Sequence, residues 1–303
     1  MPRMAYIRKR FGEGSLSIVT KANEIIEEYA AQGFILTLRQ LYYQFVARDL
    51  MENKQSEYKR LGSIINDARL TGLVDWNAIE DRTRNLESNS HWSGPGEILR
   101  SASESYRVDL WNDQDCRPEV WIEKEALVGV IEQVCRDLDV PWFACRGYNS
   151  QAEQWRAGMR LRRYASDGQV PVILHLGDHD PSGLDMTVDN RNRLSMFFGS
   201  EVEVRRLALN MDQVERYGSP PNPAKITDSR FAGYLHEHGT ESWELDALEP
   251  SVIANLIRAE VNSMLDRDLW DEKMGEQERA RDTLVNLASR WAEVEEYMSG
   301  RRG

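Results

Sequence analysis

The spacing of apolar residues near the amino terminus predicts three short helices. Residues 17–32 have apolar side chains at intervals of three and four, which is the period of one helix face. Thr37 belongs to a residue type that caps helix amino termini, so a second helix is predicted over 38–50 and a third over 56–70. Three short helices followed by the segment DWNAIEDRTR predict a winged-helix type of domain over residues 1–92.

A different pattern begins after the Ser-, Gly- and Asn-rich stretch SNSHWSGPGE. We predict a linker and connecting helix over 93–117, and from residue 118 short apolar runs alternate with helical patterns. Such alternation predicts crossover connections and a mostly parallel sheet, so the fold class is α/β, with carboxyl-terminal helices completing a domain over 118–303. Strands are predicted at 119–123, 142–145, 171–178 and 202–209, and helices at 97–111, 124–138, 150–165, 181–198, 249–266 and 275–298.

Composition and charge narrow the class of protein. Of the 303 residues, 41% are hydrophobic and 29% are charged, as in ordinary globular proteins, and no apolar run approaches the length of a membrane helix. We therefore expect a cytoplasmic protein with no membrane partner and three reduced cysteines. Residues 1–100 have 14 Lys and Arg against 13 Asp and Glu, whereas the remainder has 24 against 37. The acidic excess lies in the second part, which is compatible with a site for divalent cations.

Three acidic residues follow two of the predicted strands. Glu123 ends one strand, and Asp178 and Asp180 follow another within GDHDPSG. Ligands of parallel α/β sheets collect at the carboxyl ends of the strands, so these side chains are expected to converge. Three carboxylates form an all-oxygen site of the kind that holds Mg²⁺. A pair of aspartates in a surface turn or a helix cap is the alternative interpretation.

The predicted helix LRQLYYQFVARDL contains a candidate nucleophile. On a helical wheel Tyr42 belongs to the apolar stripe, whereas Tyr43 points away from it and lies one turn after Arg39. A neighbouring guanidinium would favour the phenolate or bind a phosphate, and tyrosine needs such help because its ordinary pKa is near 10. The alternative is a tyrosine at the boundary of an amphipathic helix.

Basic residues of the first domain are candidates for binding a phosphate backbone. They could equally be ordinary solvated side chains. The candidates are Lys59, Arg60, Arg69, Arg82 and Arg84, the last two in the predicted wing.

Three of these segments resemble one family. LTLRQLYYQ is similar to the active-site helix of the catalytic A subunit of topoisomerase VI and its relatives, the meiotic double-strand-break proteins, and VWIEKEA and GDHDPSG resemble that family's Toprim motifs. The resemblance covers roughly residues 35 to 210, and the short chain resembles compact stand-alone members. It implies a winged-helix-like (CAP-like) domain joined to a Toprim domain, and DNA cleavage by transesterification with a 5'-phosphotyrosyl link. Tyr43 is then the nucleophile, Arg39 assists it, and Glu123, Asp178 and Asp180 bind Mg²⁺.

The resemblance also implies partners. In the family the tyrosine of one subunit meets the metal site of the other, so a homodimer acting on double-stranded DNA in the nucleoid is expected. The chain has no GxxxxGK[ST] phosphate loop, and a separate GHKL-type ATPase B subunit is a candidate partner whose existence the sequence leaves open. Two rival interpretations remain: a Toprim nuclease that hydrolyses DNA with activated water, and a DNA-binding protein that is inactive without a partner.

Overall fold

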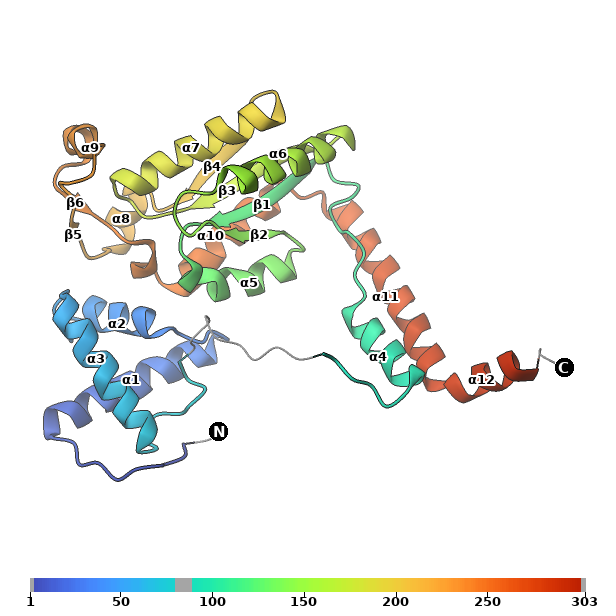
Figure 1. Ribbon diagram of the computed structural model, residues 1–303, viewed down its shortest axis with the longest axis horizontal. Coiled ribbons are helices and arrows are strands. Elements are labelled where there is room, and N and C mark those ends of the chain that lie inside the picture. Colours follow the sequence, from blue (N-terminus) through green and yellow to red (C-terminus); the bar gives the residue numbers. More distant parts are fainter. Residues whose placement is uncertain (1–2, 80–88, 301–303) are drawn as a thin grey trace. The chain divides into compact units, whose positions relative to one another are not determined.

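The computed structural model describes residues 3–79 and 89–300, and its contacts divide the chain into two compact units (Figure 1). The first unit comprises Met1–Arg84 and Pro118–Asn262, and the second comprises Asn85–Arg117 and Ser263–Gly303. The division at residues 92 and 117 stays a prediction. In the structure, the helices that follow Ser263 group with residues 85–117, whereas the helix predicted at 249–266 groups with the sheet.

The three helices predicted near the amino terminus are present and share one hydrophobic core. They are α1 (Glu13–Ala31), α2 (Leu38–Ala47) and α3 (Gln55–Leu70). Thr37 caps α2 as expected, because its side chain accepts a hydrogen bond from the Gln40 amide while the Gln40 side chain accepts one from the Thr37 amide. The winged-helix type remains a prediction, since the residues expected in the wing, Arg82 and Arg84, lie outside the described residues.

A four-stranded parallel sheet forms the centre of the first unit, which confirms the α/β class. The strands lie in the order β2-β1-β3-β4, and their bounds are β1 (Cys116–Ile122), β2 (Trp142–Ala144), β3 (Val170–Leu176) and β4 (Glu203–Ala208). Strands β1 and β3, which precede the predicted acidic residues, are neighbours. Their inward side chains, including Trp121, Ile122, Ile173 and Leu174, are almost fully buried.

Helices cover both faces of this sheet (Figure 1). Helices α6 (Gln151–Ser166) and α7 (Pro181–Phe198) lie on one face, whereas α5 (Val128–Asp137) and α10 (Pro250–Ser263) lie on the other. A short 3₁₀ turn, η1 (Glu125–Leu127), joins β1 to α5. The predicted helix at 124–138 therefore begins as a 3₁₀ turn, while the predicted helix at 181–198 has the predicted bounds.

The segment between β4 and α10 has more regular structure than its turn-rich sequence predicts. It contains α8 (Met211–Tyr217), α9 (Phe231–His238), the antiparallel pair β5 (Asn222–Pro223) and β6 (Glu241–Ser242), and the 3₁₀ turn η2 (Leu245–Ala247). The first four residues of LHEHG end α9. The buried Tyr234 fixes this helix by donating to the carbonyls of His179 and Glu241.

The second unit is helical. Helix α4 (Pro95–Ser105) packs along α11 (Arg267–Ser289), and α12 (Trp291–Gly300) follows. Gly96 of α4 lies at this contact, where a Cβ atom would lie 3.3 Å from the Ala288 carbonyl oxygen of α11. The single helix predicted over 275–298 is thus two helices, and the helix predicted over 97–111 ends at Ser105. In the described part of the chain, no helix is both long enough and apolar enough to span a membrane.

Candidate functional site

Glu123 and Asp178 meet at the carboxyl edge of the sheet. Each follows the end of one of the two neighbouring strands β1 and β3, and the Asp178 amide donates a hydrogen bond of 2.9 Å to Glu123 Oε2. Burial raises the pKa of Glu123, and burial together with the Glu123 charge raises the pKa of Asp178 to about 7 against the opposing effect of Lys124. The Glu123 charge thus disfavours ionisation of Asp178, whereas the hydrogen bond from the Asp178 amide favours ionisation of Glu123.

Asp180 has a different role in the same turn. Its Oδ1 accepts hydrogen bonds from the Gly183 amide at 2.6 Å and the Ser182 hydroxyl at 3.0 Å, so it caps α7. Gly183 is required there, because a Cβ atom would lie 2.2 Å from the Asp178 carbonyl oxygen. The interpretation of Asp180 as a helix cap, which the sequence left open, describes this arrangement.

The predicted magnesium ligands have suitable chemistry but are not assembled as a set. Carboxylate oxygens are the donors that Mg²⁺ prefers. Across residues 3–79 and 89–300, however, no group of three or more His, Cys, Asp or Glu side chains is arranged to hold a metal ion. Glu123 and Asp178 are together, Asp180 caps a helix, and the ammonium of Lys124 lies 3.0 Å from Asp178 Oδ1.

Lys124 is the centre of a buried charge cluster at this edge. Its Nζ is 3.0 Å from Asp178 Oδ1 and 3.0 Å from Glu244 Oε2, and it also pairs with Asp246. Burial alone would lower the pKa of Lys124, but the carboxylates of Asp246, Asp178 and Glu244 outweigh it and raise the pKa. We call Lys124, Asp178, Glu244 and Asp246 the Lys124 cluster. It contains one cationic side chain and three acidic ones.

Helix α2 adds a second cation and a phenol to the Lys124 cluster. The Arg39 guanidinium lies 2.9 Å from Glu244 Oε2 and 3.1 Å from Asp246 Oδ2, and its carbon is 6.0 Å from the centre of the Tyr43 ring. The Tyr43 hydroxyl lies close enough to Glu244 for that carboxylate to raise its pKa. Residues more than 200 positions apart thus meet in one site that contains a guanidinium, an ammonium, a phenol and carboxylates.

The surroundings of Tyr43 differ from the expectation. The helical wheel assigned Tyr42 to the core and turned Tyr43 away from it, yet each is only 4% exposed. Tyr43 is buried because η2 covers this side of α2. Burial, Glu244 and Asp246 raise the pKa of Tyr43, and Arg39 opposes them without prevailing. The prediction that Arg39 lies beside Tyr43 is confirmed. Arg39 favours the phenolate as predicted, but burial and the two carboxylates outweigh it, so the pKa of Tyr43 lies above its ordinary value.

Two sets of hydrogen bonds hold the turn that contains Asp178 in place. His179 pairs with Trp243 through both backbone hydrogen bonds, at 2.8 and 3.0 Å, which places Glu244 and Asp246 beside the turn that contains Asp178. Arg206 of β4 donates to the backbone carbonyls of Gly177, Asp178, Gly183 and Leu209. Arg206 is largely buried, and this burial lowers its pKa to about 10.

Sequence reasoning missed Lys124, Arg206, Glu244 and Asp246. Lys124 lies inside the motif VWIEKEA, and Arg206 lies within the predicted strand VEVRRLAL, so both offered a local signal. Glu244 and Asp246 alternate in WELDALEP, as do the aspartates of GDHDPSG, but nothing local connects two such turns.

The predicted phosphate contacts have different surroundings. Lys59 and Arg60 are exposed on α3, and Arg60 pairs with Glu57 at 2.9 Å. Arg69 is half-buried and donates to the Ile79 carbonyl, and burial lowers its pKa. Arg69 therefore supports the fold of α1, α2 and α3, which together we call the helical domain. Lys59 and Arg60 stay available to a ligand.

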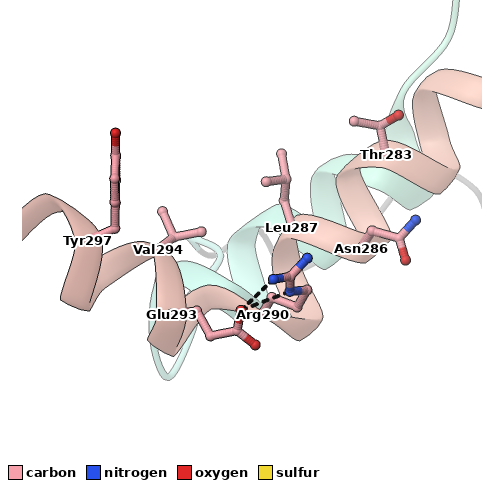
Figure 2. Close-up of a pocket in the computed structure, with 7 residues that line it drawn as sticks. All are labelled: Thr283, Asn286, Leu287, Arg290, Glu293, Val294 and Tyr297. Atoms are coloured by element: carbon pink, nitrogen blue, oxygen red, sulfur yellow. Dashed lines mark hydrogen bonds and ion pairs between the residues drawn. The ribbon is translucent and has the colours of Figure 1, made fainter.

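A hollow of about 560 Å³ lies on the second unit, between α11 and α12 (Figure 2). Its lining has one ion pair, Arg290 with Glu293 at 2.5 Å, beside apolar and neutral polar side chains. One carboxylate already paired with an arginine offers neither a nucleophile nor a cation site. The Lys124 cluster with Arg39 and Tyr43 is therefore the candidate site. The lining residues are Thr283, Asn286, Leu287, Arg290, Glu293, Val294 and Tyr297.

Comparisons of the chain with protein-family models, with curated proteins and with solved structures found no match.

Proposed function

We propose that the chain cleaves DNA by transesterification, with the Tyr43 hydroxyl attacking a backbone phosphate. The observation that supports this most is the meeting of Tyr43 and Arg39 with the Lys124 cluster at the carboxyl edge of a parallel sheet. The resemblance of three sequence segments to the topoisomerase VI A-subunit family points to the same chemistry and to a winged-helix-like domain joined to a Toprim domain.

The side chains around Tyr43 suit such a reaction. Glu244 lies beside the phenol and, although burial alone would raise its pKa, Lys124, Tyr43 and Arg39 lower it to about 2. The ionised Glu244 is positioned to take the phenolic proton as the oxygen attacks phosphorus. The Tyr43 O–P bond forms, the bond from phosphorus to the 3' oxygen breaks, and the leaving 3' oxygen takes up a proton. Arg39 and Lys124 offer positive charge to the phosphate.

Mg²⁺ is proposed as the cofactor on the strength of the resemblance and of the oxygen donors Glu123, Asp178 and Asp180 at this edge. Bound there, it would stabilise negative charge on the phosphate. Because Lys124 pairs with Asp178, binding requires that this ion pair opens.

The proposed partners are double-stranded DNA and a second copy of the chain, with a separate GHKL-type ATPase B subunit as a third candidate; such a protein would work in the nucleoid. In the family the tyrosine acts on the partner subunit's site, whereas here Tyr43 lies beside Glu244 of its own chain. The proposal therefore requires that the contact between α2 and η2 is exchanged between subunits.

A trapping experiment tests the proposed chemistry. The protein is incubated with duplex DNA and Mg²⁺ and then denatured, and covalent attachment to 5' ends is measured. Tyr43→Phe is expected to abolish the adduct, whereas Tyr42→Phe, which removes a hydroxyl bonded to the Lys54 amide, is expected to retain it. Free 5' phosphates would indicate hydrolysis, and intact but retarded DNA would indicate binding alone; either result contradicts the proposal.

Mixing variants tests the exchange between subunits. Tyr43→Phe lacks the nucleophile and Glu123→Gln lacks an acid of the opposing site, so a mixed dimer retains one intact composite site if the tyrosine acts across the interface. Adduct formation in the mixture, with none in either variant alone, is expected. An inactive mixture would place the tyrosine and the acids in the same subunit.

A further inference from the structure

Residues 3–10 form a basic arm on an acidic protein. Residues 3–10 are all exposed, and they include Arg3, Arg8, Lys9 and Arg10, whereas the first acidic residue of the chain is Glu13. The whole chain has a formal net charge of -12. A run of four cations on such a chain is the kind of local charge that attracts a polyanion.

The arm has a defined position along the carboxyl-terminal end of α3. The amides of Tyr6 and Ile7 donate to the Leu70 carbonyl at 2.8 and 3.2 Å, and the Trp76 indole donates to the Met4 carbonyl at 3.1 Å. The Tyr6 and Trp76 rings are in edge contact, with centres 5.6 Å apart. Three hydrogen bonds and an aromatic contact thus hold the arm against the helical domain.

Part of the positive charge on the arm is not balanced. Lys9 pairs with Asp67 of α3, and Arg3 pairs with Glu27 at 3.3 Å. Considering residues 3–79 and 89–300 only, Arg8 and Arg10 have neither an ion pair nor a side-chain hydrogen bond, and the same is true of Lys59 on α3. These three exposed cations belong to the arm and to the helix that it follows.

We infer that the arm and the exposed face of α3 form a binding surface for the phosphates of duplex DNA, separate from the Tyr43 site. The identification of the polyanion as DNA rests on the proposed function. Duplex DNA is favoured because a helix can lie in a groove of the duplex while an extended arm with arginines follows the adjacent phosphate backbone. An arm of eight residues reaches at most roughly 25 Å, enough to follow several phosphates.

Binding measurements test the surface independently of cleavage. The full chain is titrated against a labelled DNA duplex in EDTA, over a range of KCl concentrations, and compared with Arg8→Gln/Arg10→Gln. Each lost phosphate contact reduces the slope of log K against log salt by about 0.9, so the double variant should lower the slope by about 2 and weaken binding roughly tenfold at low salt. Both side chains are exposed and unpaired, so an unchanged melting temperature is expected.

A matched control removes the same charge elsewhere. Arg163→Gln/Arg279→Gln changes one exposed arginine of α6 and one of α11 and should leave the salt slope unchanged. Equal behaviour of the two double variants would overturn the inference, because net charge alone would then explain the effect.

Two competitors check the identity of the polyanion. Met4, Tyr6 and Ile7 are exposed beside the cations, a composition also found in membrane-surface segments. Vesicles of anionic lipid and a single-stranded RNA are therefore tested against the same variants, and a larger loss with either than with duplex DNA would overturn the assignment. If Arg8→Gln/Arg10→Gln reduces DNA binding but the unchanged chain forms no Tyr43 adduct, the binding surface is supported and the proposed chemistry is refuted. If the adduct forms but the double variant binds DNA as well as the unchanged chain, the chemistry is supported and the binding surface is refuted.

Discussion

Tyr42 and Tyr43 are neighbours with equal burial and different surroundings. The Tyr42 hydroxyl accepts from the Lys54 amide at 2.8 Å and lies among backbone groups, so its role is to hold the turn between α2 and α3. The Tyr43 hydroxyl meets a carboxylate instead. A helical wheel distinguishes the two directions, and it says nothing about which distant segment each direction faces.

Lys124 is the residue on which the charge cluster depends. Lys124→Met keeps the apolar stem and leaves Asp178, Glu244 and Asp246 without their ammonium. Removing one partner of a buried ion pair leaves uncompensated charge, so the free energy of unfolding should fall by about 3 kcal/mol, measured by urea denaturation. Millimolar Mg²⁺ should raise the melting temperature of this variant more than that of the unchanged chain.

The control for Lys124→Met is Lys273→Met. Lys273 also pairs with two acids, Asp113 at 2.9 Å and Glu276 at 3.3 Å, but these pairs are solvated and contribute little. A similar loss of stability in both variants would show that the Lys124 cluster is not effectively buried.

The buried His175 should make the free energy of unfolding depend on pH. It is fully buried on β3, where burial and then the Arg206 charge lower its pKa from 6.5 to about 3. The unfolded chain therefore binds a proton below pH 6.5 that the folded chain does not bind until about pH 3. Between these values stability falls as pH falls, by roughly 1.4 kcal/mol per pH unit.

The variant His175→Asn isolates this effect, because the Asn amide can replace Nδ1 in the 2.9 Å contact with the Thr187 hydroxyl. Urea unfolding at pH 6.5 and pH 5 should show a smaller loss of stability for the variant than for the unchanged chain. Equal losses would mean that His175 is protonated in the folded state.

At the scale of elements, the junction between β3 and α7 depends on a glycine. Gly183→Ala would place a Cβ atom 2.2 Å from the Asp178 carbonyl oxygen, so the turn and the first turn of α7 must separate. The expected cost is about 2 kcal/mol or more in the free energy of unfolding. Gly233→Ala in α9 has nothing within 4 Å and should stabilise by up to about 1 kcal/mol. Thermal denaturation of both variants checks the pair, and destabilisation by Gly233→Ala as well would remove the steric explanation.

For the whole molecule, the contact between α2 and η2 joins the amino-terminal helices to the edge of the sheet. Arg39→Gln removes the guanidinium that pairs with Glu244 and Asp246, so hydrogen exchange should become faster in residues 38–47 and 243–248. Arg48→Gln is the control, since Arg48 pairs with Glu28 inside the helical domain. Unchanged exchange after Arg39→Gln would show that apolar packing alone maintains the contact.

The sequence by itself determined the elements and part of the site. Apolar periodicity, the Thr37 cap and the alternation of strands with helices act within a few residues of the chain, so the three helices, the α/β class and the neighbouring positions of Glu123 and Asp178 could be predicted. The tertiary structure alone decided that Glu244 and Asp246 face Arg39 and Tyr43, that Lys124 pairs with Asp178, and that the last helices group with residues 85–117. Such contacts join segments up to 205 positions apart, and no local pattern encodes which buried charges will neutralise one another once the chain has folded.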